Sequence, residues 1–210
     1  MTLRVVAISD THCQHDALEI PAADVLVHAG DFTNLGRDEE LAAFDAFLAS
    51  LPHRHKIVIA GNHDFCFERE PERARAGLTG CHYLEDGGVE IEGVRFYGSP
   101  WQPRFLNWAF NLDRGAPLRA KWDLIPEGID VLITHGPPLG HGDATFSGEP
   151  VGCADLLAAI ERVRPRFHVF GHIHEGYGVT RNEHTTFINA STCDARYGPV
   201  NAPVCFEVET

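Results

Sequence analysis

The 210-residue sequence has no long apolar run and few positive charges. No stretch approaches the ~20 apolar residues that a membrane-spanning helix needs. The apolar start at residues 3–8 is too short for a secretory signal and soon meets Asp10. The 17 lysines and arginines face 30 aspartates and glutamates, which gives a formal net charge of -13 and argues against coating nucleic acid or binding anionic membranes. We therefore expect a cytoplasmic protein with neither of these partners.

The signatures of several other classes are also missing. The six cysteines form no CxxC pair, which argues against a zinc ribbon and is typical of a reducing compartment. The sequence contains neither the GxxxxGK[ST] loop of a nucleotide kinase or ATPase nor a GxSxG nucleophile elbow. No cysteine is followed six positions later by an arginine, so cysteine-phosphatase chemistry lacks its signature as well.

What is present fits one globular domain over residues 1–210, since 44% of the residues are hydrophobic and 22% are charged. Short apolar runs rich in valine and isoleucine predict strands buried on both faces, at residues 3–8, 25–29, 57–60, 131–134 and 167–170. Apolar residues recur at helical spacing over 41–51, with Asp38 as the expected N-cap, and over 156–163, before Pro165.

The middle and the end of the sequence carry a different pattern. Residues 83–85, 89–92 and 94–97, with glycines between them, predict successive antiparallel strands. Residues 186–189 and 204–208 predict further strands. Alternating strands and helices followed by a meander indicate an α/β fold of the mixed α+β kind, in which helices cover mixed sheets.

Polar side chains directly follow the apolar runs. These segments are Asp10-Thr11-His12, Gly30-Asp31, Gly61-Asn62-His63-Asp64, Thr134-His135 and Gly171-His172-Ile173-His174. Because ligands gather at the carboxyl ends of strands in open α/β sheets, we expect these side chains at one rim. Oxygen and imidazole donors without a thiolate suit Mn, Fe, Zn or Co. Each motif alone occurs often by chance, whereas the full set in order, each after a strand, predicts a metal site.

The same segments resemble the pattern DxH, GD, GNH(D/E), H and GHxH of the calcineurin-like metallophosphoesterase superfamily. The words SPWQP (99–103), THGPPLGHGD (134–143) and FGHIHEGYG (170–178) are similar to the metallophosphoesterase-domain branch first noted in animal brain proteins. The resemblance implies a four-layer α-β-β-α sandwich of two mixed sheets, with the active site at the C-terminal ends of strands. Cys13 departs from the pattern, because many members have glycine there.

The resemblance also implies a role for each motif residue. It assigns ligands to two divalent metal ions per chain: Asp10, His12 and His174 at one, Asn62, His135 and His172 at the other, and Asp31 as the bridge. His63 would face the substrate phosphate as a catalytic residue, with Asp64 behind it to fix its tautomer. Such a centre, with Mn as the expected metal, would activate a bridging hydroxide for in-line attack on phosphorus.

Residues 96–110 are rich in aromatic side chains, and their prolines and polar neighbours predict a loop. We expect Trp101 to stack on a base or aryl group and Arg104 to contact phosphate. Aromatic packing or a subunit contact explains this segment equally well. His141, in a Gly/Pro-rich loop after His135, is a further candidate for substrate binding.

The function expected from these observations is hydrolysis of small phosphodiesters, with cyclic nucleotides among the candidates. A phosphomonoesterase is the first alternative, because the same two-metal core serves both reactions. A non-catalytic metal-binding interaction module is the second, although scaffolds of that kind typically lack several ligands. The motifs leave the substrate, the native metal and the oligomeric state open.

Overall fold

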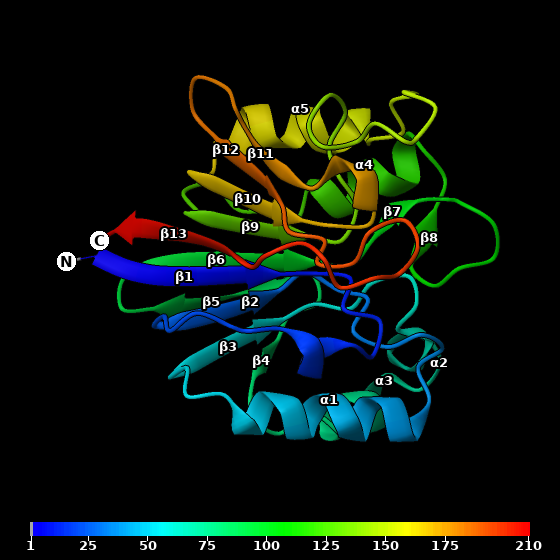
Figure 1. Ribbon diagram of the computed structural model, residues 1–210. Helices are drawn as coiled ribbons and strands as arrows, with labels where there is room; N and C mark the ends of the chain where they lie inside the picture. The colour runs from blue at the N-terminus through cyan, green and yellow to red at the C-terminus, as the bar shows by residue number, and fades with distance from the viewer. Residues whose placement is uncertain (1) are drawn as a thin grey trace.

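The computed structural model describes residues 2–210, which form two large mixed sheets with helices on their outer faces (Figure 1). The first sheet contains, in spatial order, β13 (Val204–Glu209), β1 (Thr2–Ile8), β2 (Val25–His28), β3 (His55–Val58) and β4 (His82–Tyr83). The second contains β11 (Gly178–Arg181), β12 (Thr186–Asn189), β10 (Phe167–Phe170), β9 (Val131–Thr134), β6 (Val94–Ser99) and β5 (Gly87–Ile91). Two short strands, β7 (Gln102–Pro103) and β8 (Asn111–Leu112), pair separately.

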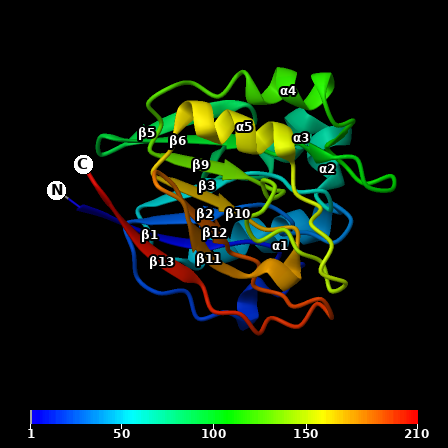
Figure 2. The ribbon, with the colours of Figure 1, turned by 90° about the horizontal axis from the view of Figure 1, so that it is seen from above.

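Helices cover the outer face of each sheet. Along the chain the helices are η1 (His15–Ala17), α1 (Asp38–Ser50), α2 (Phe65–Arg69), α3 (Pro71–Ala76), α4 (Ala116–Trp122), α5 (Ala154–Val163) and η2 (His174–Gly176), the last of which begins at a predicted ligand. Figure 1 shows α1 and α3 below the first sheet, and Figure 2 shows α4 and α5 over the second. Among residues 2–210, no helix is both long and apolar enough to span a bilayer.

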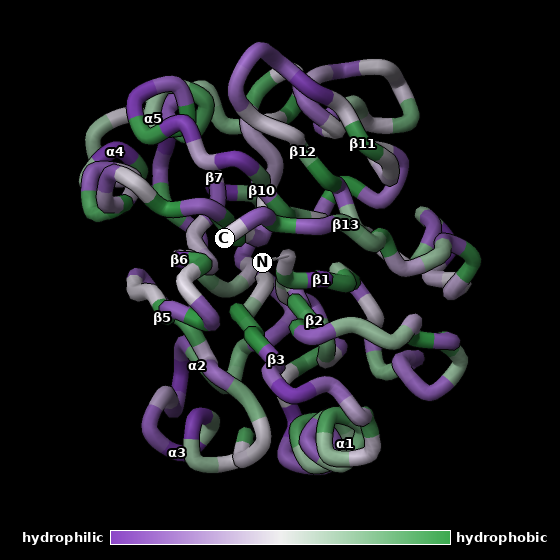
Figure 3. Tube along the Cα trace, turned by 90° about the vertical axis from the view of Figure 1, so that its left-hand side faces the viewer, coloured by the Kyte–Doolittle hydropathy of each residue, from purple (hydrophilic) through white to green (hydrophobic). Residues whose placement is uncertain are grey.

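Three apolar clusters fill the spaces between the four layers. Between the sheets, side chains such as Val27 and Ile57 pack against Ile133 and Val169. The outer face of the first sheet packs on α1, and that of the second packs on α4 and α5. Figure 3 shows the apolar strands at the centre of the fold and polar loops around it. The expected α-β-β-α sandwich of two mixed sheets is therefore confirmed.

The central strands of both sheets run parallel, and antiparallel strands lie at the edges. In the first sheet β1, β2, β3 and β4 pair in parallel while β13 is antiparallel to β1. In the second, β6, β9, β10 and β12 pair in parallel, with β5 and β11 antiparallel at the edges. A parallel bridge between Ser9 and Ser191, just beyond β1 and β12, joins the sheets at their carboxyl ends. This edge is where the predicted ligands follow the strands.

Two expectations about local structure need correction. The segment near residue 83 was expected to pair antiparallel with the hairpin that follows, but β4 lies in the first sheet, parallel to β3. Because β4 is only two residues long, its partner strand is decided by packing with distant parts of the chain, which the local sequence pattern does not encode. The first long helix begins at Asp38 and has Arg37, not Asp38, at its N-cap. The carboxylate of Glu40 accepts the backbone N–H of Arg37 at 3.1 Å and so takes over the capping role.

Arg164 offers a test of backbone strain outside the site. It ends α5 in the left-handed region at φ 52°, where a side chain costs roughly 1–2 kcal/mol and glycine costs little. Arg164→Gly should therefore raise the free energy of unfolding by about 0.5–1 kcal/mol in urea titrations. The control Arg164→Ala removes the same guanidinium but keeps the strain, so it should not stabilise. Equal effects of the two variants would contradict the strain explanation.

Candidate metal centre

The carboxyl ends of five parallel strands place the predicted ligands at one edge of the sandwich. Each ligand lies within four residues of its strand end: Asp10 and His12 after β1, Asp31 after β2, Asn62 after β3, His135 after β9, and His172 and His174 after β10. Four of them turn from the strand in the left-handed region, with φ of 53° at Asp10, 43° at His12, 58° at Asp31 and 68° at His172. This strained backbone aims side chains inward that a regular strand would separate.

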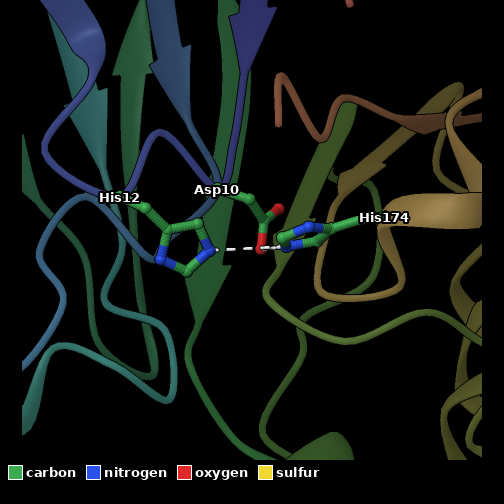
Figure 4. A group of neighbouring side chains, drawn as sticks. All are labelled: Asp10, His12 and His174. Carbon is green, nitrogen blue, oxygen red and sulfur yellow. Dashed lines mark hydrogen bonds and ion pairs between the residues drawn. The ribbon is translucent and has the colours of Figure 1, made fainter. Parts of the chain in front are cut away.

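One group of ligands forms around Asp10, whose carboxylate is fully buried (Figure 4). Its Oδ1 lies 3.3 Å from Nε2 of His174, and the Nε2 atoms of His174 and His12 are 3.4 Å apart. The backbone N–H of His172 donates to the same carboxylate at 3.0 Å, and the Ser191 hydroxyl donates at 2.9 Å. These bonds hold Asp10 facing two imidazoles.

A second group forms around His135, which is buried. Its Nε2 lies 2.9 Å from Oδ1 of Asn62 and 3.3 Å from Oδ2 of Asp31. The Nδ1–H donates to the Ala29 carbonyl at 2.9 Å, so Nε2 is the atom turned toward the site. The ring of His172 stands edge-on at 5.0 Å between centroids.

Asp31 lies between the two groups. Its Oδ2 is 3.3 Å from Nε2 of His135 and 3.9 Å from Nε2 of His12. Its Oδ1 accepts the backbone N–H of His63 at 2.7 Å, which fixes the carboxylate plane. The geometry is that expected of a shared ligand, and the bridging role itself stays a prediction.

Burial and charge divide the site histidines into two kinds. Burial lowers the pKa of His12 to about 4 and that of His172 to about 3, so both present neutral nitrogen at pH 7. Neutral imidazole is the form that binds metals.

The other two histidines face carboxylates. Burial lowers the pKa of His135 and His174, but Asp31 beside the first and Asp10 beside the second outweigh it and raise both values to about 9. Burial raises the pKa of Asp10, yet the bond from His174 dominates and keeps it well below its usual range. Two buried carboxylates are thus balanced by imidazole protons that a divalent cation would displace. The donor atoms of Asp10, His12 and His174 lie within 4.8 Å of one another, and so do those of Asp10, Asp31 and His135 and those of His12, Asp31 and His63. This nitrogen and oxygen donor set fits a divalent metal ion.

The predicted link between Asp64 and His63 is wrong. His63 Nδ1 donates to the Asn34 carbonyl at 2.9 Å. Asp64 instead accepts backbone N–H groups of Asp31 and Gly61, both at 2.8 Å, and the hydroxyl of Thr33 at 2.7 Å. Burial and the nearby Asp31 raise its pKa to about 7. Asp64 therefore ties two ligand-bearing loops together, whereas a backbone carbonyl, which carries no sequence signal, fixes His63.

Two aromatic residues without a motif complete the surroundings of His63. Its ring lies 4.2 Å from the Trp108 ring and 4.7 Å from the His12 ring, measured between centroids. Tyr197 lies over the site as well, 4.6 Å from His12 and 5.5 Å from His174. Trp108 was visible in the sequence only as part of an aromatic segment, and Tyr197 had no local signal.

The predicted substrate-binding residues lie in different surroundings in the structure. Arg104 lines a cavity of about 420 Å³ that also contains His172, and its guanidinium pairs with Asp113 at 2.7 Å. The indole N–H of Trp101 donates to Asp86 at 2.9 Å, and Lys121 lies 4.2 Å above the indole. These contacts favour the packing role that was weighed for Trp101.

His141 also has a partner inside the fold. Its ring stacks on that of Phe187 at 3.6 Å between centroids, and its Nδ1 lies 2.9 Å from the Thr180 hydroxyl. Neither it nor Trp101 lines the cavity beside His172. Substrate contacts of both residues stay predictions.

The comparison with known proteins agrees with this geometry. The family model described as calcineurin-like phosphoesterase matches residues 3–176, which contain every predicted ligand. The chain belongs to this family. The calcineurin-like phosphoesterase described here is 48% identical to metallophosphoesterase domain-containing protein 1 of Homo sapiens, over 99% of this chain and 71% of the human protein. The family resemblance predicted from the motifs is therefore confirmed, and a metal-dependent phosphoesterase is supported.

Two further matches extend the comparison. A UPF0046 protein of Caenorhabditis elegans is 44% identical to this calcineurin-like phosphoesterase, over 98% of this chain and 60% of the worm protein. The crystal structure of TT1561 from Thermus thermophilus superposes with a TM-score of 0.63 at 15% identity, covering 90% of this chain and 89% of that one. At this identity the likeness shows the fold alone.

Close packing at Gly171 allows a test of the Asp10 group. A Cβ atom at residue 171 would lie 1.9 Å from Oδ2 of Asp10 and 2.2 Å from Oγ of Ser9. Gly171→Ala should displace the carboxylate, weaken Mn²⁺ binding by about 10–100-fold in titration calorimetry, and lower the free energy of unfolding by about 1–3 kcal/mol. The control is Gly80→Ala, since a Cβ atom there meets nothing within 4 Å. Unchanged Mn²⁺ affinity in Gly171→Ala would remove Asp10 from the ligand set.

Proposed function

We propose that this chain is a dinuclear metal-dependent phosphoesterase that hydrolyses small phosphodiesters. The observation that supports it most is the position of Asp31, 3.3 Å from His135 in one ligand group and 3.9 Å from His12 in the other. One carboxylate shared by two groups of nitrogen and oxygen donors is the arrangement that a pair of ions requires. Mn²⁺ is the proposed metal, and Fe, Zn or Co suit the same donors.

Divalent ions held there would supply an activated water and offset the negative charge of the phosphoryl oxygens. The chain itself orients the donors, because Nδ1 of His135 is held by the Ala29 carbonyl and Nδ1 of His174 by the Asp194 carbonyl, both at 2.9 Å. Both rings therefore keep Nε2 toward the site. Asp64 fixes the backbone of the Asp31 and Gly61 loops from behind.

His63 is positioned to move a proton. Its Nδ1–H is committed to the Asn34 carbonyl at 2.9 Å, so Nε2 is the atom that gains or releases a proton. Its ring lies against His12 of the first ligand group, at 4.7 Å between centroids. We infer that Nε2–H donates to the departing ester oxygen.

The cavity beside His172 suits the organic part of the substrate. It has a volume of about 420 Å³, and its lining combines apolar surface from Pro103, Phe105 and Ile173 with two arginines, Arg104 and Arg114, and with Glu175. Cavities of this size and character hold small molecules in other proteins. A small phosphate ester is therefore the proposed substrate class, and a monoester with the same core is the alternative that a substrate panel separates.

Metal removal tests the reaction class. Chelation with EDTA should abolish hydrolysis of bis(4-nitrophenyl) phosphate, and added Mn²⁺ should restore it, because the attacking water of the proposed reaction would be activated by the bound ions. The measurement is nitrophenolate release, with metal content followed by elemental analysis. Full activity of a verified metal-free preparation would contradict the mechanism, and activity on 4-nitrophenyl phosphate alone would favour the monoesterase.

A leaving-group series tests the proton carried by His63. His63→Ala should lose little on nitrophenyl esters, whose leaving group needs no proton, and about 10²–10⁴-fold in kcat on alkyl esters. Metal content should be unchanged, because His63 is not a proposed ligand. The matched control is His184→Ala, an exposed histidine whose imidazole lies 3.8 Å from the carboxylate of the adjacent Glu183. An equal loss on every ester would mean that His63 stabilises phosphoryl charge rather than donating a proton.

A further inference from the structure

A second cavity lies beside the segment of residues 103–108. It has a volume of about 610 Å³, and its lining includes Leu35, Arg37, Phe65, Arg69, Leu106 and Trp108. The first half of the segment lines the cavity that contains His172, and the second half lines this one. The two cavities therefore flank the same stretch of chain. We call the second one the arginine cavity.

Trp108 connects the arginine cavity to the metal centre. Its indole ring lies 4.2 Å from the imidazole of His63, with 31° between the ring planes. The next residue, Ala109, donates its backbone N–H to the carbonyl of the ligand Asn62 at 3.1 Å. The segment also lies beside α2 (Figure 1), where the Phe110 N–H donates to Glu68 at 2.8 Å. The cavity wall is thus fixed directly against the residue proposed to act on the ester.

The two arginines of this cavity differ from those that pair with a carboxylate. Several arginines of this acidic chain form such ion pairs; Arg73, for example, pairs with Asp38 and Glu70. Within residues 2–210, neither Arg37 nor Arg69 forms an ion pair with a carboxylate. The guanidinium of Arg69 instead lies 4.4 Å above the ring of Phe65. Two guanidiniums without a counterion thus share a cavity with Phe65 and Trp108.

We propose that the arginine cavity binds a second oxyanion of the substrate, carried on a planar arm of an acyclic phosphate ester. The proposal rests on the proposed function. The half-buried indole of Trp108 offers aromatic surface to a planar arm, Phe65 supports the guanidinium of Arg69 from below, and guanidiniums bind carboxylate or phosphate oxygens in a two-point contact. An acyclic diester has two arms that can leave phosphorus toward the two flanking cavities. A cyclic ester carries both ester oxygens on one sugar and occupies only one of them.

The experiment compares three 4-nitrophenyl phosphodiesters with Mn²⁺-loaded protein. The second arm is a naphthyl group that bears a carboxylate, a phosphonate or a neutral carboxamide at its far end. We expect kcat/KM for the two anionic diesters to exceed that for the carboxamide by roughly tenfold, since a charged hydrogen bond contributes about 1.5–3 kcal/mol. Arg37→Gln and Arg69→Gln should each reduce this preference, and Arg69→Lys should retain part of it. A preference confined to the phosphonate supports the proposal and identifies phosphate as the anion.

The control is Arg73→Gln, which removes the same charge from α3 but an arginine already paired with carboxylates. It should leave the preference intact. Equal kcat/KM for all three diesters in the wild type, or an equal loss in Arg73→Gln, would overturn the proposal.

Quenching of tryptophan fluorescence by naphthalene-2,6-dicarboxylate, measured in EDTA, tests anion binding in the arginine cavity independently of ester hydrolysis. Binding that Arg69→Gln weakens about tenfold supports the cavity even if no ester is hydrolysed, in which case the proposed function fails alone. Binding that neither arginine variant changes overturns the cavity while leaving hydrolysis untouched.

Discussion

The arrangement of the site depends on neutralising two buried carboxylates, those of Asp10 and Asp31. A carboxylate without partners in a protein interior would cost many kcal/mol, so each must be surrounded by donors. Asp10 receives the His172 N–H, the Ser191 hydroxyl and the His174 imidazole; Asp31 receives the His63 N–H and faces His135. These partners come from strand ends far apart in sequence. The charge balance therefore holds only when both sheets are in place.

Packing within the sandwich offsets the strain that the ligand geometry imposes on the backbone. Four ligands have left-handed backbones, each at a cost of roughly 1–2 kcal/mol, and Gly61 and Gly171 leave no room for a Cβ atom beside Asp31 and Asp10. Apolar packing between the layers and the Ser9–Ser191 bridge hold the strand ends together against this strain. The fold alone thus places the metal-ligating side chains, so metal binding has to order little additional chain.

What the sequence could predict depended on how local its signal was. Asp10, Asp31 and His135 were predictable because each directly follows a short Val- or Ile-rich run whose carboxyl end meets the others at one edge. The partner of His63 was not, because the carbonyl of Asn34 is a backbone atom that any residue would offer. Tyr197 reaches His12 from a loop 185 positions away, and no spacing rule connects the two.

The pairing of β1 with β13 sets Thr2 opposite Glu209, while Asp10 follows the other end of β1. A seven-residue strand spans roughly 20 Å, so the first and last strands bring their outer ends together well away from the ligands. The position of the chain ends can therefore be changed without moving the strand ends that carry the ligands. A short peptide joining the two ends, with a new opening in the exposed loop around Phe146, would give a circular permutant in which each ligand still follows the same strand.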